Sequence, residues 1–399
     1  MAKNLSIVAN GISGDEGHLL GYNVSDNGIY TPAIGDVVRG TTATYVAQDG
    51  TLKTAPPNVA RVDYANGVAE LLSEPTSTNL VTYSEDFSQG YWVKQSSSVV
   101  ANQSTSPNGT NNAFLYNSTS NTFNFLQAVQ SVSTLDFFTF SVFIKKGTAN
   151  GARLSFSGSA YTNARNVEFD LANGTFTETS SFTKGTIKEL SNGWYLCSVG
   201  GVPDTLGSLN CRIQAIGDNN NSNIYIWGSQ FEKSQTPSSY IPTNGATSTR
   251  SADSLTNFGS SQIIDSQSGI LFFEGSLLSV GGSNRAISLN DGSSSNTLYL
   301  IFFGNGDTKV SYYSSNTSGM SDVITNTNIT DTKKYVIQYS QNIINVFIDG
   351  TSVYSGSING FSANILKELD FNSSSTSESF YGRVRQVKHL PYNTDITTL

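Results

Sequence analysis

The residues that come closest to an enzyme's active site lie near the C-terminus, at residues 368–372, which read Glu-Leu-Asp-Phe-Asn. Alternate side chains of a β-strand share one face, so Glu368 and Asp370 would face one cleft, as the two carboxylates of a glycoside hydrolase do. The next position on that face is Asn372, whose amide cannot act as an acid or a base. A shorter version, residues 168–170, ends after two carboxylates. We therefore predict ordinary strand carboxylates and a protein that is not an enzyme.

Histidine and cysteine are too rare for most other catalytic or metal chemistry. The chain contains two histidines, His18 and His389, and two cysteines, Cys197 and Cys211. A Ser-His-Asp or Cys-His site needs a histidine beside a nucleophile, and a zinc site needs several such ligands. Cys197 lies in an apolar run, which favours a buried free thiol over a disulfide with Cys211. We predict no metal and no cofactor, and the alternative is a calcium ion held by Asp- and Asn-rich loops.

Carbohydrate binding suits this sequence better, because aromatic and amide side chains are common in it. Sugar rings pack on exposed aromatic rings, and sugar hydroxyl groups pair with Asn, Asp and Gln side chains. The candidate glycan-binding residues are Tyr161, Asp218, Asn219, Asp291, Asp307 and Tyr312. Each also has a purely structural interpretation, since Asp and Asn are common turn formers and a tyrosine can belong to the core.

The charge of the chain excludes some classes of partner. Charged residues make up 13% of the chain, and the net charge is −8. Binding nucleic acid through its phosphates needs clustered Lys and Arg, so we predict no nucleic-acid partner. The N-terminus lacks the apolar run of a signal peptide, and no apolar stretch is long enough to span a membrane. We therefore expect synthesis in a host cytoplasm and no membrane insertion.

Short alternating segments predict an all-β protein. Residues 138–145 alternate between apolar and polar side chains, as a half-buried strand does. Asn-Gly at 173–174 separates two such segments, and Asp-Gly at 349–350 closes the clearest pair, 335–339 with 343–348. These dipeptides favour the tight turns of β-hairpins. Because no amphipathic helix separates the segments, the pattern indicates antiparallel β-sandwiches of the jelly-roll type.

The composition divides the chain into four parts. Residues 1–75 are polar and rich in Gly and Thr, and we predict that they form an N-terminal attachment arm and connector. Residues 76–242 form the first predicted sandwich, and residues 254–399 form the second. The stretch between them, residues 243–253, consists mainly of small and polar residues and is predicted to be a linker.

Two sequence blocks resemble a recurring part of phage tail and virion-surface proteins. The first block, residues 61–92, contains Leu-Leu-Ser-Glu-Pro, Thr-Asn-Leu and Ser-Glu-Asp-Phe, followed by a Trp. The second block, residues 227–253, contains Trp-Gly-Ser-Gln-Phe-Glu, Ser-Ser-Tyr-Ile-Pro-Thr and Thr-Arg-Ser-Ala-Asp. The resemblance covers roughly residues 38–253. It implies that the two blocks open and close one module.

Charged residues inside the two blocks are candidates for structural ion pairs. Arg61 and Asp63 stand two positions apart in the first block, and Glu74 and Arg250 come from one block each. Charges are rare in this chain, so we expect each of these two pairs to form a salt bridge.

The C-terminal part resembles the concanavalin A-like, or laminin-G-like, jelly-roll superfamily. The resemblance rests on Tyr-Val-Ile-Gln-Tyr at 335–339, Asn-Val-Phe-Ile-Asp-Gly at 345–350 and Phe-Tyr-Gly-Arg-Val at 380–384. It implies a concanavalin A-like fold for residues 254–399. The Asp/Asn run that binds metal in the lectins of this superfamily has no counterpart in the sequence, so no metal site is carried over.

Together the resemblances imply a virion protein of the tail-fibre or spike type that binds a receptor. They imply attachment to other virion proteins through residues 1–60, a homotrimer, and non-covalent binding of host cell-surface polysaccharide. Two alternatives stay open. One is a structural capsid or tail decoration protein without a specific ligand, and the other is a polysaccharide depolymerase.

Overall fold

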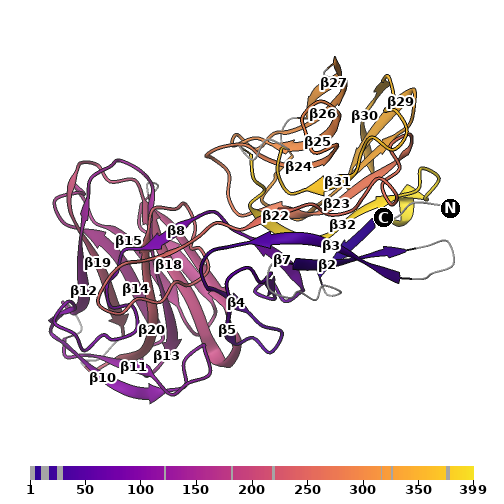
Figure 1. The fold of residues 1–399 in the computed structure, drawn as a ribbon. Coiled ribbons are helices and arrows are strands. Elements are labelled where there is room, and N and C mark those ends of the chain that lie inside the picture. The colour runs from indigo at the N-terminus through magenta and orange to yellow at the C-terminus, as the bar shows by residue number, and fades with distance from the viewer. Residues whose placement is uncertain are drawn as a thin grey trace. The chain divides into compact units, whose positions relative to one another are not determined.

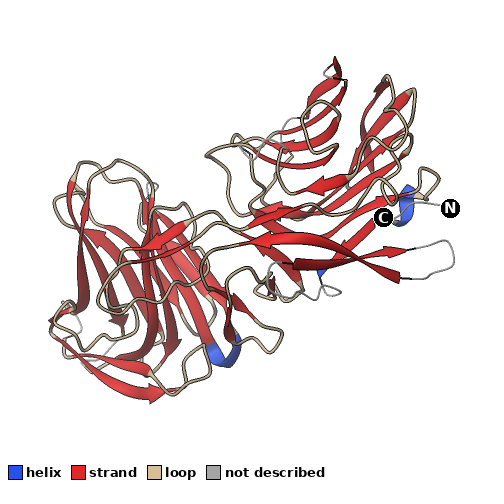
Figure 2. Ribbon diagram, in the orientation of Figure 1, coloured by secondary structure: helices blue, strands red, loops and turns tan. Residues whose placement is uncertain are grey.

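The structure is a computed structural model, and it describes residues 5–9, 18–24, 30–120, 123–180, 183–217, 221–315, 317–324, 327–373 and 378–399. In this part of the chain the backbone consists of β-strands and turns, with short 3₁₀ turns such as η2 (Ser191–Gly193) and η3 (Ile396–Thr398) (Figure 2). The predicted all-β fold is therefore confirmed. The chain divides into two compact units. Unit 1 comprises Met1–Thr42, Ala55–Pro75 and Ser251–Leu399, and unit 2 comprises Ala43–Thr54 and Thr76–Arg250.

Unit 1 contains an eleven-stranded sheet, called sheet 1 (Figure 1). Its strands are β1 (Leu5–Val8), β2 (His18–Val24), β3 (Tyr30–Val38), β6 (Val62–Asp63), β7 (Glu70–Ser73), β22 (Ser254–Thr256), β23 (Gly269–Leu277), β28 (Lys333–Tyr339), β29 (Ile343–Ile348), β30 (Thr351–Ser357) and β32 (Gly382–Leu390). The order is β22-β3-β2-β1-β32-β23-β28-β29-β30, and β7 pairs with β32 and β6.

A five-stranded sheet, called sheet 2, completes the sandwich of unit 1. Its strands are β24 (Arg285–Asn290), β25 (Thr297–Phe302), β26 (Thr308–Ser314), β27 (Thr317–Ile324) and β31 (Glu368–Asp370), in the order β27-β26-β25-β24-β31. The core between sheets 1 and 2 contains buried residues from both, among them Leu271, Phe273, Ile337, Leu298, Leu300 and Val310. Each such side chain contributes about 1.5–3 kcal/mol by leaving water.

The N-terminal residues are strands of sheet 1. β1 pairs antiparallel with β32, with Leu5 opposite His389, and β22 pairs with β3. Leu5 and Ile7 are buried in the core of unit 1, since alternate positions of β1 face sheet 2. We expected residues 1–75 to form an arm and connector. The structure instead places residues 1–42 and 55–75 in one unit with residues 251–399.

Unit 2 is a second sandwich, made of two six-stranded sheets. Sheet 3 contains β10 (Ser97–Ser104), β11 (Ala113–Ser118), β13 (Phe138–Lys146), β17 (Lys184–Glu189), β18 (Trp194–Gly201) and β20 (Asn223–Glu232), in the order β10-β11-β20-β13-β18-β17. Sheet 4 contains β9 (Val93–Gln95), β12 (Phe125–Val132), β14 (Gly151–Ser157), β15 (Arg165–Asp170), β16 (Thr175–Glu178) and β19 (Gly207–Ile216), in the order β16-β15-β14-β19-β12-β9. The free thiols of Cys197 and Cys211 are buried in the core between these sheets, as predicted for Cys197.

The parts of the two sequence blocks that belong to unit 2, residues 76–92 and 227–250, meet there. β8 (Ser77–Asn79), from the first block, pairs with β21 (Ser248–Arg250), from the second. The Asn79 side chain donates hydrogen bonds to the carbonyl oxygens of Ser229, at 3.0 Å, and Ile241, at 2.8 Å. The expected linker at 243–253 thus contributes a paired strand to unit 2.

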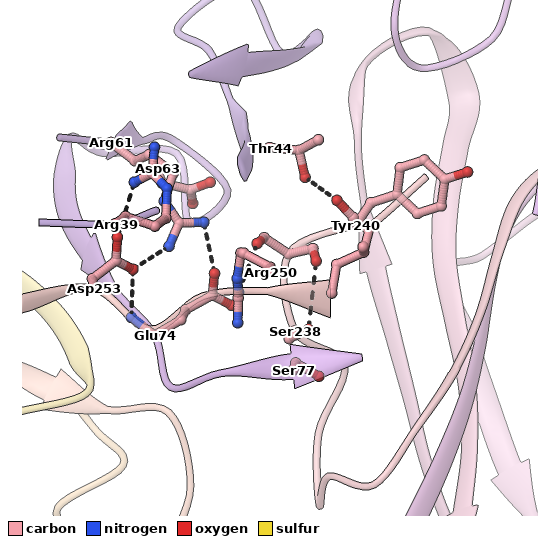
Figure 3. Close-up of polar contacts among 12 residues, drawn as sticks. Arg39, Thr44, Arg61, Asp63, Glu74, Ser77, Ser238, Tyr240, Arg250 and Asp253 are labelled. Atoms are coloured by element: carbon pink, nitrogen blue, oxygen red, sulfur yellow. Dashed lines mark hydrogen bonds and ion pairs between the residues drawn. The ribbon is translucent and has the colours of Figure 1, made fainter. Parts of the chain in front are cut away.

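The outer face of sheet 3 is covered. A small hairpin, β4 (Ala43–Val46) and β5 (Leu52–Ala55), supplies Leu52 to an apolar cluster that also contains Phe143, Trp194, Trp227 and Tyr240. The Thr44 hydroxyl donates to the Tyr240 carbonyl at 2.7 Å and fixes the hairpin (Figure 3). The outer face of sheet 4 is different, because it carries charged side chains that are about one third exposed or more, such as Arg153 and Glu168. Sheet 4 is therefore the sheet that presents a surface to solvent.

A buried ion cluster holds unit 1 together (Figure 3). The Arg61 guanidinium contacts a Glu74 oxygen at 2.6 Å and an Asp253 oxygen at 2.5 Å, and Arg39 contacts the other Asp253 oxygen at 2.9 Å. Burial lowers the pKa of Arg61, but the two carboxylates outweigh it and raise the pKa above its usual value. These four residues come from the three segments of unit 1, close to the points where the chain passes to unit 2.

The partners of Arg61 and Asp63 differ from the expected pairing. We expected these two residues to pair with each other. The structure gives Arg61 the partners Glu74 and Asp253, and it gives Asp63 a partner on β32, Arg383, at 2.5 Å. The reason is the position of β6 beside β7 and β32, which brings distant charges together. The second expected pair, Glu74 with Arg250, joins residues of different units and stays a prediction.

Candidate functional site

A polar cavity of about 680 Å³ lies at one end of the sandwich of unit 2. It is formed where β14 begins, β15 turns into β16 and β19 ends. Three threonines contribute to its walls. The other side chains that matter for binding are Asn150, Glu168, Asp170, Asn173, Phe176 and Asn221.

Strand β15 places two carboxylates at the cavity. Along β15, Val167 and Phe169 are buried in the core, so Glu168 and Asp170 point to the opposite face. Asp170 pairs with Thr175 at the end of the β15–β16 hairpin. This hairpin was predicted from Asn-Gly at 173–174 and is confirmed. The cavity therefore forms at a turn whose position the local sequence predicts.

The turn itself is held by the Asp170 carboxylate. Its Oδ1 atom accepts hydrogen bonds from the backbone N–H groups of Ala172, at 2.9 Å, and Asn173, at 3.1 Å. The Asn173 amide donates to the other oxygen at 2.7 Å. These bonds, with the side chain of Asn173 first, hold the pKa of the partly exposed Asp170 below its usual value. Asp170 is thus a hydrogen-bond acceptor at neutral pH and not a proton donor.

Glu168 belongs to a row of polar side chains on sheet 4. It forms an ion pair with Arg153 on β14, and both side chains are partly exposed. Thr177 lies opposite Glu168 on β16 and also lines the cavity. The pair with Arg153 orients the Glu168 carboxylate while leaving part of it in contact with solvent.

The chemistry of the cavity matches a sugar. Carboxylate oxygens accept hydrogen bonds from hydroxyl groups, and the amides of Asn150, Asn173 and Asn221 can both donate and accept. Phe176 is 40% exposed and supplies an apolar ring at the edge of sheet 4.

The first predicted aromatic residue, Tyr161, is not available to a ligand. It is buried, and its ring stacks on Phe156 at 5.7 Å between ring centroids. The Arg165 guanidinium lies 5.5 Å from the ring centroid, and the hydroxyl donates to the Gly201 carbonyl at 3.3 Å. Burial raises the pKa of Tyr161. We therefore remove Tyr161 from the candidate site, because its ring is already packed against the protein.

The second, Tyr312, is also a core residue. It has no exposed surface, and its ring packs 4.4 Å from Phe361 in the core of unit 1. Its hydroxyl donates to the Asn359 carbonyl. The prediction did not anticipate this, because the sequence of β26 alone does not show which of its two faces sheet 1 covers.

The predicted acidic residues occupy turns. Asp291 accepts hydrogen bonds from the Ser293 backbone and side chain and from Asn296. Burial raises the pKa of Asp291, but these bonds outweigh it and lower the pKa. Asp307 accepts from the Asn305 amide at 2.7 Å. Both residues belong to unit 1, whereas the cavity residues belong to unit 2. The carboxylate of each residue stabilises the turn in which it lies.

The remaining candidates, Asp218 and Asn219, lie outside the described residues. Of the residues next to them in the chain, Gly217, Asn221 and Ser222 line the cavity. Sequence reasoning missed Asn150 and Phe176. The available signal was the hairpin at 168–177, where a Glu-x-Asp strand, an Asn-Gly turn and a Thr-Phe-Thr strand bring polar and aromatic groups together.

The second carboxylate pair, Glu368 and Asp370, shares one face of β31, as strand alternation predicts. Leu369 between them is buried in the core of unit 1. Asp370 is itself buried and accepts hydrogen bonds from the Asn257 backbone at 2.7 Å and the Asn290 amide at 3.0 Å. Burial raises the pKa of both carboxyl groups. Asp370 thus anchors a turn and a neighbouring strand, which is a structural task.

Metal and membrane sites were sought in the same part of the chain. Among the described residues, no group of three or more His, Cys, Asp or Glu side chains is arranged to hold a metal ion. None of the helices that the structure describes is long and apolar enough to cross a membrane.

Comparisons with known proteins give weak similarities. No family model matches the sequence, and no curated protein matches it. A structure of domains LG4-5 of the mouse laminin α1 chain is 14% identical, with a TM-score of 0.24, and the match covers 66% of this chain and 87% of that one. The CBM22-1-CBM22-2 tandem of Paenibacillus barcinonensis Xyn10C is 12% identical, with a TM-score of 0.26, over 78% and 97%.

A third structure, a mutant of the GH43 protein BlXynB from Bacillus licheniformis, is 8% identical, with a TM-score of 0.24, over 96% of this chain and 85% of that one. Scores this low do not establish a shared overall fold. The fold is therefore assigned from the sheets of this chain alone, and the site is assigned from its own residues.

Proposed function

We propose that this protein binds a glycan without cleaving it, at the surface of a phage particle. The observation that supports glycan binding best is the cavity of unit 2, which is lined by carboxylates, amides and hydroxyls and, at the edge of sheet 4, by the exposed Phe176. The placement on a virion rests on the resemblance of the blocks at 61–92 and 227–253. The homotrimer, the attachment to other virion proteins through residues 1–60 and the host polysaccharide as ligand are parts of the same proposal.

Each cavity offers only a few hydrogen bonds and one aromatic contact, so a single site binds weakly. Several copies in one particle convert later binding events into intramolecular ones. Such linkage can raise the overall affinity by about 10²–10⁴ without any new contact. A weak site is therefore compatible with firm attachment.

The test is retardation of the full-length protein in affinity gels that contain xylan, mannan, β-glucan, dextran or lipopolysaccharide. We expect at least one polysaccharide to retard it, and we expect Phe176→Ala and Glu168→Gln to weaken that binding by about tenfold, or 1.4 kcal/mol. Leu206→Ala, at an exposed apolar position of unit 2 outside the cavity, serves as control. Wild-type mobility that is unaffected by every polysaccharide would reject the proposal.

The absence of cleavage is also part of the proposal. It is supported by the structural hydrogen bonds of Asp370 and by Asn372, which stands where a third carboxylate would be needed. Incubation with the bound polysaccharide should release no new reducing ends. If reducing ends appear and Glu368→Gln abolishes them, the protein is a depolymerase instead.

A further inference from the structure

A second patch of exposed aromatic surface lies on sheet 4, away from the cavity. Phe123 is 56% exposed, and its ring meets Phe125 edge-to-face at 5.3 Å. The Arg212 guanidinium lies 4.3 Å from the centroid of the Phe125 ring, and Arg212 Nε donates to Gln127 at 2.6 Å. We call Phe123, Phe125 and Arg212 the aromatic platform. Phe123 lies in the bend before β12, and its exposed ring is a typical contact for the apolar face of a sugar.

The aromatic platform and Glu168 of the cavity lie on the same outer face of sheet 4, whereas Phe176 pairs with Phe169 and points to the other face. The positions that alternate with those of the platform and Glu168 are buried in the core of unit 2, namely Leu126, Ile213, Leu154 and Val167. Arg153 stands directly opposite Glu168 on one side and Gln214 on the other. The Gln214 amide donates to the Asn124 carbonyl at 2.7 Å, next to Phe125. A continuous row of polar side chains thus runs from the cavity to the platform.

The length of this row exceeds one sugar ring. Sheet 4 has the order β15-β14-β19-β12, so three strand spacings separate the strand of Glu168 from that of Phe125. Neighbouring strands are about 4.8 Å apart, which gives a span of about 14 Å. A ligand that touches both ends must contain several sugar residues and lie across the strands.

A polar group on the same face also lacks a partner. Ser155 is buried on the outer side of β14, opposite Asn166 and Arg212. Within the described residues, its hydroxyl has no hydrogen-bond partner. A buried hydroxyl without a partner costs free energy, which a hydrogen bond from a ligand hydroxyl would offset. This observation favours a hydroxyl-rich ligand over an apolar one.

We propose that the aromatic platform is a second glycan subsite, and that the protein takes an extended oligosaccharide across sheet 4 instead of a single terminal sugar. This inference rests on the proposed function of the cavity. The cavity binds one end through carboxylates and amides, Arg153 and Gln214 contact the middle, and Phe123 packs on a ring at the other end.

The experiment is calorimetric titration of the full-length protein with a length series, from monosaccharide to hexasaccharide, prepared from the polysaccharide that retards it in the gel. Wild-type affinity should rise with length and level off when the span is filled. Phe123→Ala should lower the affinity for the longest oligosaccharide by about tenfold and leave the monosaccharide unaffected. Phe176→Ala should weaken every member, and Leu206→Ala none.

The outcomes separate this inference from the proposed function. The inference is overturned if the affinity does not depend on the length of the oligosaccharide, or if Phe123→Ala binds the hexasaccharide as tightly as the wild type does. Either result leaves the cavity intact as a glycan site. A changed oligomeric state of Phe123→Ala with unchanged glycan binding also overturns it, since the platform is then a subunit contact. No binding at any length rejects the proposed function itself. The melting temperature of each variant confirms that it is folded.

Discussion

Replacing Arg61 by methionine tests whether the buried ion cluster stabilises unit 1. Arg61 has 1% of its surface exposed and contacts Glu74 and Asp253 at 2.6 and 2.5 Å. Methionine fills most of the volume but offers no positive charge. Asp253 would keep Arg39, whereas Glu74 would lose the ion-pair partner that Arg61 provides. The buried cluster would keep both carboxylates, Glu74 and Asp253, but lose one of its positive charges, which is the costly consequence.

The expected size follows from that geometry. Removing one partner of a buried ion pair destabilises a protein by about 3–5 kcal/mol. For a domain of about 150–250 residues, each kcal/mol lowers the melting temperature by about 2–4 °C. The transition of unit 1 in differential scanning calorimetry should therefore move down by about 6–20 °C in Arg61→Met. The transition of unit 2 should not move if the two units unfold separately.

An exposed pair in the same unit provides the control. Lys333 contacts Asp349 at 2.9 Å, but the two side chains are 27% and 45% exposed. A surface pair of this kind contributes about 0–1 kcal/mol, so Lys333→Met should shift the transition by a few degrees at most. Added salt should reduce the effect of Lys333→Met and leave that of Arg61→Met nearly unchanged, because buried pairs are screened less. Equal shifts for the two variants would refute the reasoning.

Three further predictions concern unit 2 and metal binding. Burial raises the pKa of Glu232 despite hydrogen bonds from Ser77, Gln230 and Ser238, so the folded unit binds this proton more tightly than the unfolded chain. The contribution of Glu232 to stability should therefore fall as pH rises from its ordinary pKa of 4.5 through the raised value. Over that range, the difference between the melting temperatures of the wild type and Glu232→Gln should decrease. A difference that does not change with pH would contradict this. Lys94 donates to three backbone carbonyls in the loop before β9, at 3.1–3.2 Å. Lys94→Met should therefore lower the free energy of unfolding of unit 2 by about 1–2 kcal/mol in a denaturant titration. An unchanged unfolding midpoint would contradict this. We also predict that EDTA leaves both melting transitions unchanged, whereas a calcium-reversible drop would reveal the loop-bound ion considered as the alternative.

Local sequence patterns are sufficient for the strands and turns. The alternation at 138–145 corresponds to β13, although this strand is buried on both faces and not half-buried as predicted. Asn-Gly at 173–174 forms the β15–β16 turn, with Gly174 at a φ of +66°. Both features are local, because side-chain alternation and turn dihedrals depend on neighbouring residues. Burial of particular rings is not local. Tyr161 and Tyr312 were predicted to be exposed, but the opposing packing in each sandwich buries them.

By itself, the sequence determined the all-β class, the free thiol of Cys197 and the β15–β16 hairpin, whereas the two blocks, expected to delimit one module, are divided between units 1 and 2. The tertiary structure decided which residues meet. Arg61 reaches Asp253 across 192 positions of sequence. The cavity joins Asn150, Glu168 and Asn221 from separate segments, and the row from Glu168 to Phe125 depends on the strand order of sheet 4. Strand order and register are set by the burial of whole faces, and no short sequence pattern encodes them.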